Sequence, residues 1–337
     1  DDEADFIALR DPELPCQQIE GLGRSVKPLD DLRAFATLVR LMRTQRPDIV
    51  HTHTAKAGVL GRLAAFVARV PIRVHTFHGH VLHGYFSPLV TKLVILIEKM
   101  LARRTTTLAA VGAQVRADLL AAGIGKPQQF TVVPPGVSIS ATLTKLEARE
   151  QLGLPLDAPI VLFVGRLTRI KRPDRLMEAF RGVLSRVPNA VLAIAGEGDL
   201  LDETKDLAHD LGDSVKFLGW QSDLSRVYPA ADVVALTSDN EGMPVTLIEA
   251  SMLGIPCVTT DVGSAREVVL NEQTGFVTSI QPPKIAEALT ALLTDWDLTK
   301  RFGAEAKVHA NTNFGTSRLV DDYAQIYRRA ISERRGT

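Results

Sequence analysis

Two carboxylates, Glu241 and Glu249, lie eight residues apart in a segment that reads NEGMPVTLIE over residues 240–249. Pro244 is typical of the first turn of a helix, where backbone N–H groups lack partners and attract anions. A carboxylate beside such a site cannot bind the anion itself, so both are expected to accept hydrogen bonds from neutral hydroxyls. A sugar on one side of the anion and a ribose on the other would fit. The alternative is that Glu249 is a buried helix acid paired with a cation.

The loop at residues 165–171, which reads GRLTRIK, brings two cations to the end of the apolar run 161–164. Arg166 offers a planar fork of N–H donors and Lys171 a compact ammonium, a combination that suits a diphosphate. The alternative is ordinary solvated charge on a surface loop. A third loop, GEG at 196–198, also follows an apolar run and precedes Asp199, an expected helix N-cap, but on its own it indicates little.

The elements that must position these loops follow from alternating short apolar runs and longer amphipathic segments. This alternation predicts an α/β fold with parallel sheets and helical crossovers, in which ligands bind beyond the carboxyl ends of the strands. The expected strands are 48–51, 72–77, 106–111, 130–134, 160–164, 190–195, 215–218, 233–236 and 256–260. The expected helices of the first half are 31–46, with Asp30 as N-cap, 56–69, 87–103 and 112–122.

The length of 337 residues predicts two domains. A Pro-Pro-Gly run at 134–136 and the polar stretch after it indicate a linker, and a second series of strands follows. We therefore predict two Rossmann-like domains with helices on both faces of each sheet, at 1–138 and 139–315. Residues 316–337 are expected to form a helix that crosses back onto the first domain.

Composition places the chain among ordinary globular proteins, with 45% hydrophobic and 23% charged residues. Cys16 and Cys257 form neither a CxxC pair nor a zinc spacing, and the acidic start is unlike a secretory leader, so a cytoplasmic location is expected. Residues 1–140 hold 17 Lys and Arg against 12 Asp and Glu, whereas the rest hold 22 against 27. Aromatic residues make up 5% and no nucleic-acid motif is present, so a nucleic-acid partner is not expected.

In their order and spacing these segments resemble the retaining glycosyltransferases of family 4, whose fold of two facing Rossmann-like domains is called GT-B. The matching segments of the second half are GR…K at 165–171, GEG at 196–198, VKFLG at 215–219, AD at 231–232 and the Glu-x7-Glu pattern that ends at Glu249. The first half adds DIVHTH at 48–53, GVLGR at 58–62 and HTFHG at 75–79. The whole is most similar to bacterial members that make capsule, O-antigen and related surface polysaccharides.

The resemblance implies a role for each matching residue. Arg166 and Lys171 bind the diphosphate, Glu249 the ribose and Glu241 the sugar. His78 faces the donor sugar from the first domain, the acceptor side, and completes the catalytic set with Arg166, Lys171 and Glu241. The donor-binding residues are Gly165, Gly242, Met243, Pro244, Val245, Thr246, Leu247, Glu249, Glu197, Leu218 and Gly219. The family needs no metal or other cofactor.

The implied reaction moves a sugar from a nucleotide diphosphate sugar, a UDP-hexose or UDP-N-acetylhexosamine, to a glycan or lipid-linked acceptor. Two alternatives remain: a sugar-nucleotide epimerase of similar fold and a non-catalytic sugar-nucleotide-binding module. Residues 1–30 show no counterpart of the family's first strand and Gly-rich loop, so the chain is expected to lack that unit. Residues 135–138, which read PGVS, stand where the family often has Asn-Gly-Val-Asp.

Four histidines at positions 75, 78, 80 and 83 form a dense cluster that suggests a metal site. No Cys, Asp or Glu accompanies them between residues 71 and 97, so this interpretation is set aside.

The expected helix 87–103 carries apolar residues at helical spacing together with Lys92, Lys99, Arg103 and Arg104. It is interpreted either as a helix packed in the core or as a basic face that docks on an anionic membrane leaflet. The second interpretation would place a cytoplasmic protein on the inner face of the membrane.

Overall fold

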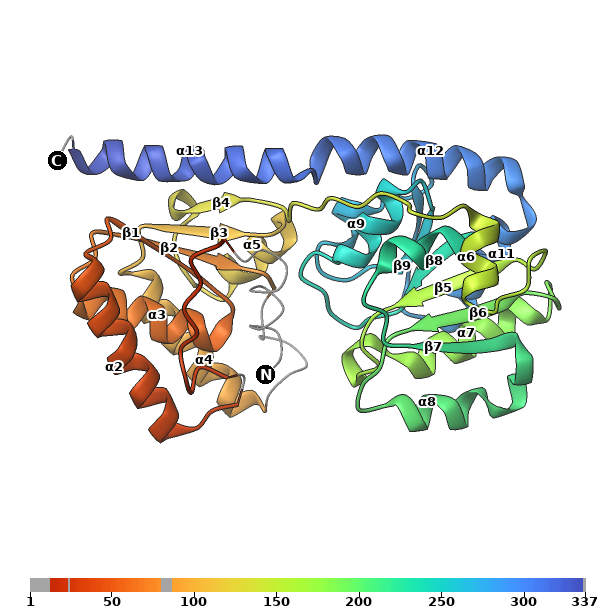
Figure 1. Cartoon of the computed structure of the whole chain (residues 1–337), viewed down its shortest axis with the longest axis horizontal. Coiled ribbons are helices and arrows are strands. Elements are labelled where there is room, and N and C mark those ends of the chain that lie inside the picture. The colour runs from red at the N-terminus through yellow and green to blue at the C-terminus, as the bar shows by residue number, and fades with distance from the viewer. Residues whose placement is uncertain (1–12, 24, 80–86, 336–337) are drawn as a thin grey trace.

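The computed structural model describes residues 13–23, 25–79 and 87–335. Within them the first half forms a four-stranded parallel sheet in the order β1-β2-β3-β4 (Figure 1). Its strands are β1 (Ile49–His53), β2 (Ile72–Phe77), β3 (Thr107–Ala110) and β4 (Phe130–Val132). Its helices are α2 (Pro28–Gln45), α3 (Ala55–Val67), α4 (Pro88–Ala102) and α5 (Ala113–Ala121).

The second half of the described chain forms a six-stranded parallel sheet in the order β10-β9-β8-β5-β6-β7. Its strands are β5 (Ile160–Val164), β6 (Val191–Ala195), β7 (Val215–Gly219), β8 (Val233–Leu236), β9 (Cys257–Thr260) and β10 (Gly275–Thr278). The strand order reverses between β5 and β8, and a crevice opens at such a point because the two following loops run in opposite directions. The residues after β5 and β8 are therefore the first place to look for a ligand site.

The helices of the second half are α6 (Lys145–Gln151), α7 (Pro173–Leu184), α8 (Leu201–Ala208), α9 (Val245–Met252), α10 (Ala265–Val268), α11 (Pro282–Thr294), α12 (Trp296–Asn313) and α13 (Thr316–Arg335). Every residue of β5, β6 and β8 is buried, as expected for central parallel strands covered on both faces. Large side chains such as Phe163, Phe180 and Tyr228 fill the space between sheet and helices. This packed domain is the rigid base of the loops that follow its strands.

The final helix crosses back to the first domain and covers the face of its sheet opposite to α3 and α4 (Figure 1). Ile326 and Ala330 of α13 pack against Ile72, Val74 and Ala109 of the first sheet. The predicted fold class, with two Rossmann-like domains and a returning C-terminal helix, is confirmed.

Two connections join the halves and run beside each other. Val137, in the segment after β4, donates its N–H to the carbonyl of Phe314 at 2.7 Å, close to the start of α13. Arg318 of α13 donates to the carbonyls of Pro134 at 2.7 Å and Pro135 at 3.1 Å. The two crossings therefore form one hydrogen-bonded strip.

The halves also touch away from this strip. The carboxylate of Glu267, on α10, accepts hydrogen bonds from the N–H groups of Ala113 at 2.9 Å and Gln114 at 3.1 Å. These are the first two residues of α5, whose N-cap Gly112 has no side chain to satisfy them. A carboxylate of one domain thus caps a helix of the other.

Two local predictions were wrong, and one strand was missed. Asp30 lies inside the first turn of α2, because Pro28 occupies the first helical position and Lys27 becomes the N-cap. Asp199 does not cap the helix after β6, which begins only at Leu201 with Leu200 as its N-cap. The strand β10 was not predicted. Among the described residues every helix is too short or too polar to cross a bilayer.

Candidate active site

Lys171 and Glu241 meet at the point where the strand order reverses. Lys171 ends a short 3-10 turn after β5, and Glu241 lies in the loop between β8 and α9. The Nζ of Lys171 lies 2.6 Å from Oε1 of Glu241, and their side chains are 19% and 11% exposed. The buried Ser238 donates its hydroxyl to the same oxygen at 2.6 Å. The pair is therefore partly buried, and Ser238 fixes the orientation of the Glu241 carboxylate.

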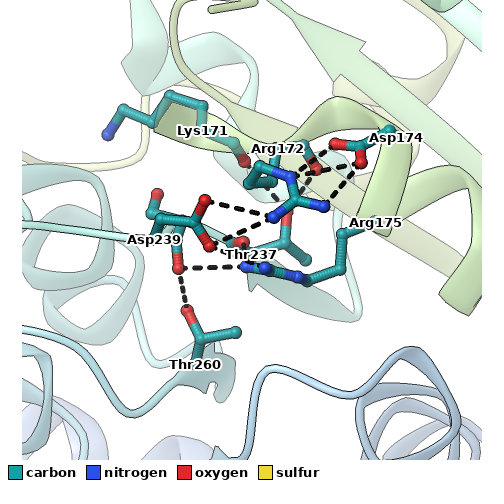
Figure 2. Close-up of polar contacts among 8 residues, drawn as sticks. Lys171, Arg172, Asp174, Arg175, Thr237, Asp239 and Thr260 are labelled. Atoms are coloured by element: carbon teal, nitrogen blue, oxygen red, sulfur yellow. Dashed lines mark hydrogen bonds and ion pairs between the residues drawn. The ribbon is translucent and has the colours of Figure 1, made fainter. Parts of the chain in front are cut away.

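A network of ion pairs under Lys171 joins its turn to the loop after β8 (Figure 2). Arg175 of α7 lies 2.6 Å from Oδ1 of Asp239 and donates to the carbonyl of Thr237 at 2.7 Å. Arg172 binds both Asp174 and Asp239, and its φ of 53° lies in the left-handed region. The hydroxyl of Thr237 in turn donates to the carbonyl of Lys171 at 3.1 Å. These contacts fix the position of the loop after β5 relative to the loop after β8.

The glycines of the loops after β5 and β6 allow their backbones to approach closely. A Cβ at Gly196 would lie 2.0 Å from the carbonyl oxygen of Gly165, so only glycine fits there. Glu197 is exposed and accepts a hydrogen bond from the N–H of Trp220 at 3.3 Å. Leu218 and Gly219 end β7 at the same sheet edge. The structure thus places the predicted residues of these three loops side by side.

Arg166, which was predicted to bind the diphosphate together with Lys171, forms no ion pair with Glu241. Its side chain is exposed and contacts no acidic group among the described residues. An exposed guanidinium on the sheet edge that holds Lys171 is free to bind an incoming anion.

Glu249 has a tyrosine as its partner. The hydroxyl of the buried Tyr228 donates to Oε2 of Glu249 at 2.7 Å and also lies 3.2 Å from the carbonyl of Thr246. Burial raises the pKa of Glu249 above its ordinary value, while the hydrogen bond from Tyr228 opposes this rise. Within the described residues Glu249 forms no ion pair, so the predicted alternative of a cation-paired acid is wrong.

The start of α9 is shifted by one residue from the prediction. Pro244 is the N-cap and Val245 the first helical residue. The N–H of Leu247 is satisfied by the carbonyl of Pro244 at 3.1 Å, whereas those of Val245 and Thr246 have no acceptor among the described residues. Two amides beside Gly242 and the buried Met243 thus remain available to an anion.

His78 approaches this loop from the first domain. A Cβ built on Gly242 would lie only 1.9 Å from the carbonyl oxygen of His78 and 3.1 Å from Cα of Gly79. The backbone after β2 therefore rests directly on the backbone that follows Glu241. The structure brings His78, Gly242 and the Lys171–Glu241 pair together across the domain boundary.

The neighbouring histidines are held in a hydrogen-bonded layer. Burial lowers the pKa of His75 from 6.5 to about 2, and its Nδ1 lies 2.9 Å from the hydroxyl of Thr52. Burial, together with His53 and His78, lowers the pKa of His51 to about 3. Both rings are therefore neutral at neutral pH. His80 and His83 lie outside the described residues, and the described side chains form no group of three metal-ligand types.

Two residues of the site and one contact between the domains were missed from the sequence. Ser238 follows β8 and stands three residues before Glu241, so a polar residue directly after a buried strand was a usable signal. Tyr228 gave no signal, because its contact with Glu249 depends on how a 3-10 turn packs on α9. Glu267 was hidden because its partners belong to the other domain.

Comparisons with known proteins cover both halves. Residues 144–309 match the family described as Glycosyl transferases group 1, and residues 2–136 match the family described as Glycosyl transferase 4-like domain. A UDP-Gal:alpha-D-GlcNAc-diphosphoundecaprenol alpha-1,3-galactosyltransferase of Escherichia coli is 30% identical over 317 residues, which cover 91% of this chain and 81% of that protein. The capsular polysaccharide biosynthesis glycosyltransferase CapM of Staphylococcus aureus is 25% identical, over 94% of this chain and 85% of its own length.

Solved structures share the fold. HepE of Anabaena, crystallised in complex with UDP and glucose, superposes with a TM-score of 0.80 at 24% sequence identity. The superposition covers 90% of this chain and 84% of HepE.

Proposed function

Because this chain belongs to the glycosyl transferases of group 1, preceded by a glycosyl transferase 4-like domain, we propose that its donor is a UDP-hexose or UDP-N-acetylhexosamine. The sugar goes to a glycan or lipid-linked acceptor, with its anomeric configuration retained. The family resemblance stated from the sequence is confirmed. The matches give no support to the epimerase or to the non-catalytic binding module.

The observation that carries the proposal is the Lys171–Glu241 pair beside the two unpaired amides of α9. A cation and two N–H groups suit a diphosphate, while a carboxylate next to them suits sugar hydroxyls. Glu249 keeps Oε1 available for ribose hydroxyls, because Tyr228 occupies only Oε2. The loops at this sheet edge thus offer a separate partner for each part of a nucleotide sugar.

The chemistry assigned to these residues is electrostatic. Lys171 and Arg166 stabilise the negative charge that grows on the diphosphate as the glycosidic bond breaks. The departing phosphate takes the proton of the acceptor hydroxyl, which attacks from the same face, and this order preserves the configuration. No metal or cofactor enters the proposal. Residues 139–315 hold the donor, residues 1–138 face the acceptor, and residues 316–337 tie the second domain to the first.

The division of labour between the two carboxylates can be tested by calorimetric titration with UDP. We expect Glu249→Ala to weaken UDP roughly 10- to 100-fold, since a hydrogen bond to a charged acceptor is worth about 1.5–3 kcal/mol. Glu241→Ala should leave UDP affinity nearly unchanged and impair turnover of the full donor, because its carboxylate serves the sugar.

The Glu249→Ala variant should still fold, because the hydroxyl of Tyr228 keeps the carbonyl of Thr246 as an acceptor. Glu203→Ala, an exposed acid on α8, is the matched control and should behave like the wild type. Equal losses of UDP affinity in both site variants would contradict the assignment. If the wild type bound none of UDP, GDP and ADP, the proposal of a donor site would be refuted.

The surface of α4 supports a finer proposal, that the first domain docks on an anionic bilayer at the inner face of the membrane. Leu89, Leu93, Leu96 and Met100, which we call the α4 stripe, are 79%, 56%, 54% and 47% exposed. The interpretation of this helix as packed in the core fails for these four residues. The spacing of four, three and four residues puts them on one face of the helix.

Cations flank this face. At about 100° per residue, Lys92, Lys99 and Arg103 fall along one side of the α4 stripe. Apolar side chains enter the acyl boundary while neighbouring cations meet lipid phosphates, each adding about 1 kcal/mol. The E. coli relative is named for an acceptor carried on diphosphoundecaprenol, which is a lipid. A lipid-linked acceptor gives such a surface a purpose.

Liposome sedimentation tests the docking surface. Binding should need anionic lipid, fall steeply with added salt, and drop in a Leu93→Glu, Leu96→Glu variant. The matched control is Val308→Glu, Val320→Glu, which charges two exposed apolar residues of α12 and α13. Equal recovery with neutral and anionic vesicles, or none with either, would point to a soluble acceptor and an ordinary solvated face.

A further inference from the structure

His53 and His78 share a hydrogen bond at the carboxyl ends of two neighbouring strands. His53 is the last residue of β1, and His78 directly follows β2. The Nδ1 of His53 lies 2.8 Å from Nε2 of His78, and the ring centroids are 5.1 Å apart. Partial burial lowers the pKa of both rings, and His78 lowers that of His53 further. Both imidazoles are therefore neutral at neutral pH.

A bond between two neutral imidazoles contains one proton. If Nδ1 of His53 carries it, His78 must carry its own proton on Nδ1 and present an N–H donor outward. If Nε2 of His78 carries it, the outer Nδ1 of His78 is a bare acceptor instead. Whether the outer Nδ1 of His78 carries a proton thus depends on which nitrogen of His53 is protonated. Neither outer nitrogen has a partner among the described residues.

The ring of His53 is held in place by the neighbouring ring of His51. The two rings lie against each other, with the centroids 4.2 Å apart and the ring planes tilted by 35°. His51 is held at both nitrogens, by Tyr327 of α13 at 2.6 Å and by Thr76 of β2 at 2.7 Å. A ring with both nitrogens engaged cannot turn freely, so it offers His53 a stable platform.

The backbone after His53 is strained. Thr54 has φ 63° and ψ 173°, a region that is essentially restricted to glycine and is costly for a β-branched residue. Such strain persists where the surrounding structure requires it, and it clusters at functional sites. Here it marks the residue that directly follows His53, at the sheet edge next to the proposed active site.

We propose that His53 is a positioning residue that sets which nitrogen of His78 carries its proton. This inference rests on the proposed function, because His78 lies against Gly242 and so beside Glu241 and the donor sugar. His53 thereby decides whether His78 donates a hydrogen bond to the substrate or accepts one. A free neutral imidazole exchanges between both forms, and only one of them matches a given substrate atom.

Side-chain ¹⁵N NMR of histidine-labelled protein, without substrate, tests the assignment directly. The signals of His78, identified by their loss in His78→Gln, should report one dominant tautomer in the wild type. His53→Ala should give the averaged shifts of two exchanging tautomers. His53→Asn should restore a hydrogen bond to Nε2 of His78, because its amide reaches the position of Nδ1, whereas His53→Gln should not. An unchanged His78 tautomer in His53→Ala would overturn the proposal.

Turnover provides the second readout. We expect His53→Ala to lower kcat about tenfold, the factor that one misplaced neutral hydrogen bond supplies, with little change in the donor KM. His53→Asn should recover most of this loss. His209→Ala, an exposed histidine at the end of α8, is the matched control and should change neither readout. Wild-type kcat in His53→Ala would also overturn the proposal.

The two proposals fail in distinguishable ways. A wild type that binds no UDP but shows a His53-dependent tautomer of His78 would remove the proposed donor and keep the pairing. Normal UDP binding and turnover, together with a His78 tautomer that is unchanged in His53→Ala, would keep the proposed donor and refute the role of His53.

Discussion

Replacing Lys171 by methionine should lower kcat by at least about 100-fold and raise the donor KM far less. Removal of one preorganised group that stabilises developing charge typically costs 10²- to 10³-fold. In the ground state the ammonium already has a partner, Glu241 at 2.6 Å, so binding the donor gains little from it. As the glycosidic bond breaks, charge on the diphosphate grows and the same ammonium gains energy only then. Steady-state kinetics over a range of donor concentrations separates the two parameters.

Arg169→Met is the control for Lys171→Met, since Arg169 is an exposed cation in the same 3-10 turn. It should retain wild-type kinetics. A raised KM with unchanged kcat in Lys171→Met would mean that the ammonium only clamps the bound donor.

Gly242→Ala should abolish most turnover while UDP affinity stays near that of the wild type. The added methyl group would lie 1.9 Å from the carbonyl oxygen of His78, a backbone atom that no rotamer change can remove. The two domains must separate at the site, and a displacement of about 1 Å costs on the order of 100-fold in rate. The residues proposed to bind the nucleotide all belong to one domain and stay in place.

Gly315→Ala is the matched control, because its Cβ would meet its nearest neighbour, the carbonyl of Asn311, at an ordinary 3.5 Å. Its kcat should equal that of the wild type. Full activity in Gly242→Ala would show that catalysis does not need the close approach of His78.

Much of the fold was predictable because the spacing and the proportion of apolar residues in a segment reflect which side chains are buried. The strands β2, β5 and β8 begin and end at the predicted residues, and β5 and β8 are wholly apolar because buried parallel strands tolerate few polar residues. The strand β10 was missed because GFVT is short and opens with a glycine that packs on the backbone of Cys257. Helix starts failed where proline or backbone geometry outweighed a side-chain cap, as at Pro28.

The site was predictable as a set of loops but not as a set of contacts. Strand order alone places the loops of Lys171 and Glu241 next to each other, and the sequence indicated both loops. That the two side chains bind each other depends on Ser238 and on the ion pairs of Asp239, which no spacing predicts. The bond between His53 and His78 likewise requires the register of β1 against β2.

The paired crossings at Val137 and Phe314 restrict how the two domains can move. Because these segments are bonded to each other, we expect them to act as a single hinge about which the two domains rotate. A rotation displaces atoms in proportion to their distance from the axis. The contacts that such a motion breaks include two backbone hydrogen bonds to Glu267 and the packing of His78 on Gly242. A rotation of this kind would open the site for product release while breaking few interactions. The same geometry would return when the next donor binds.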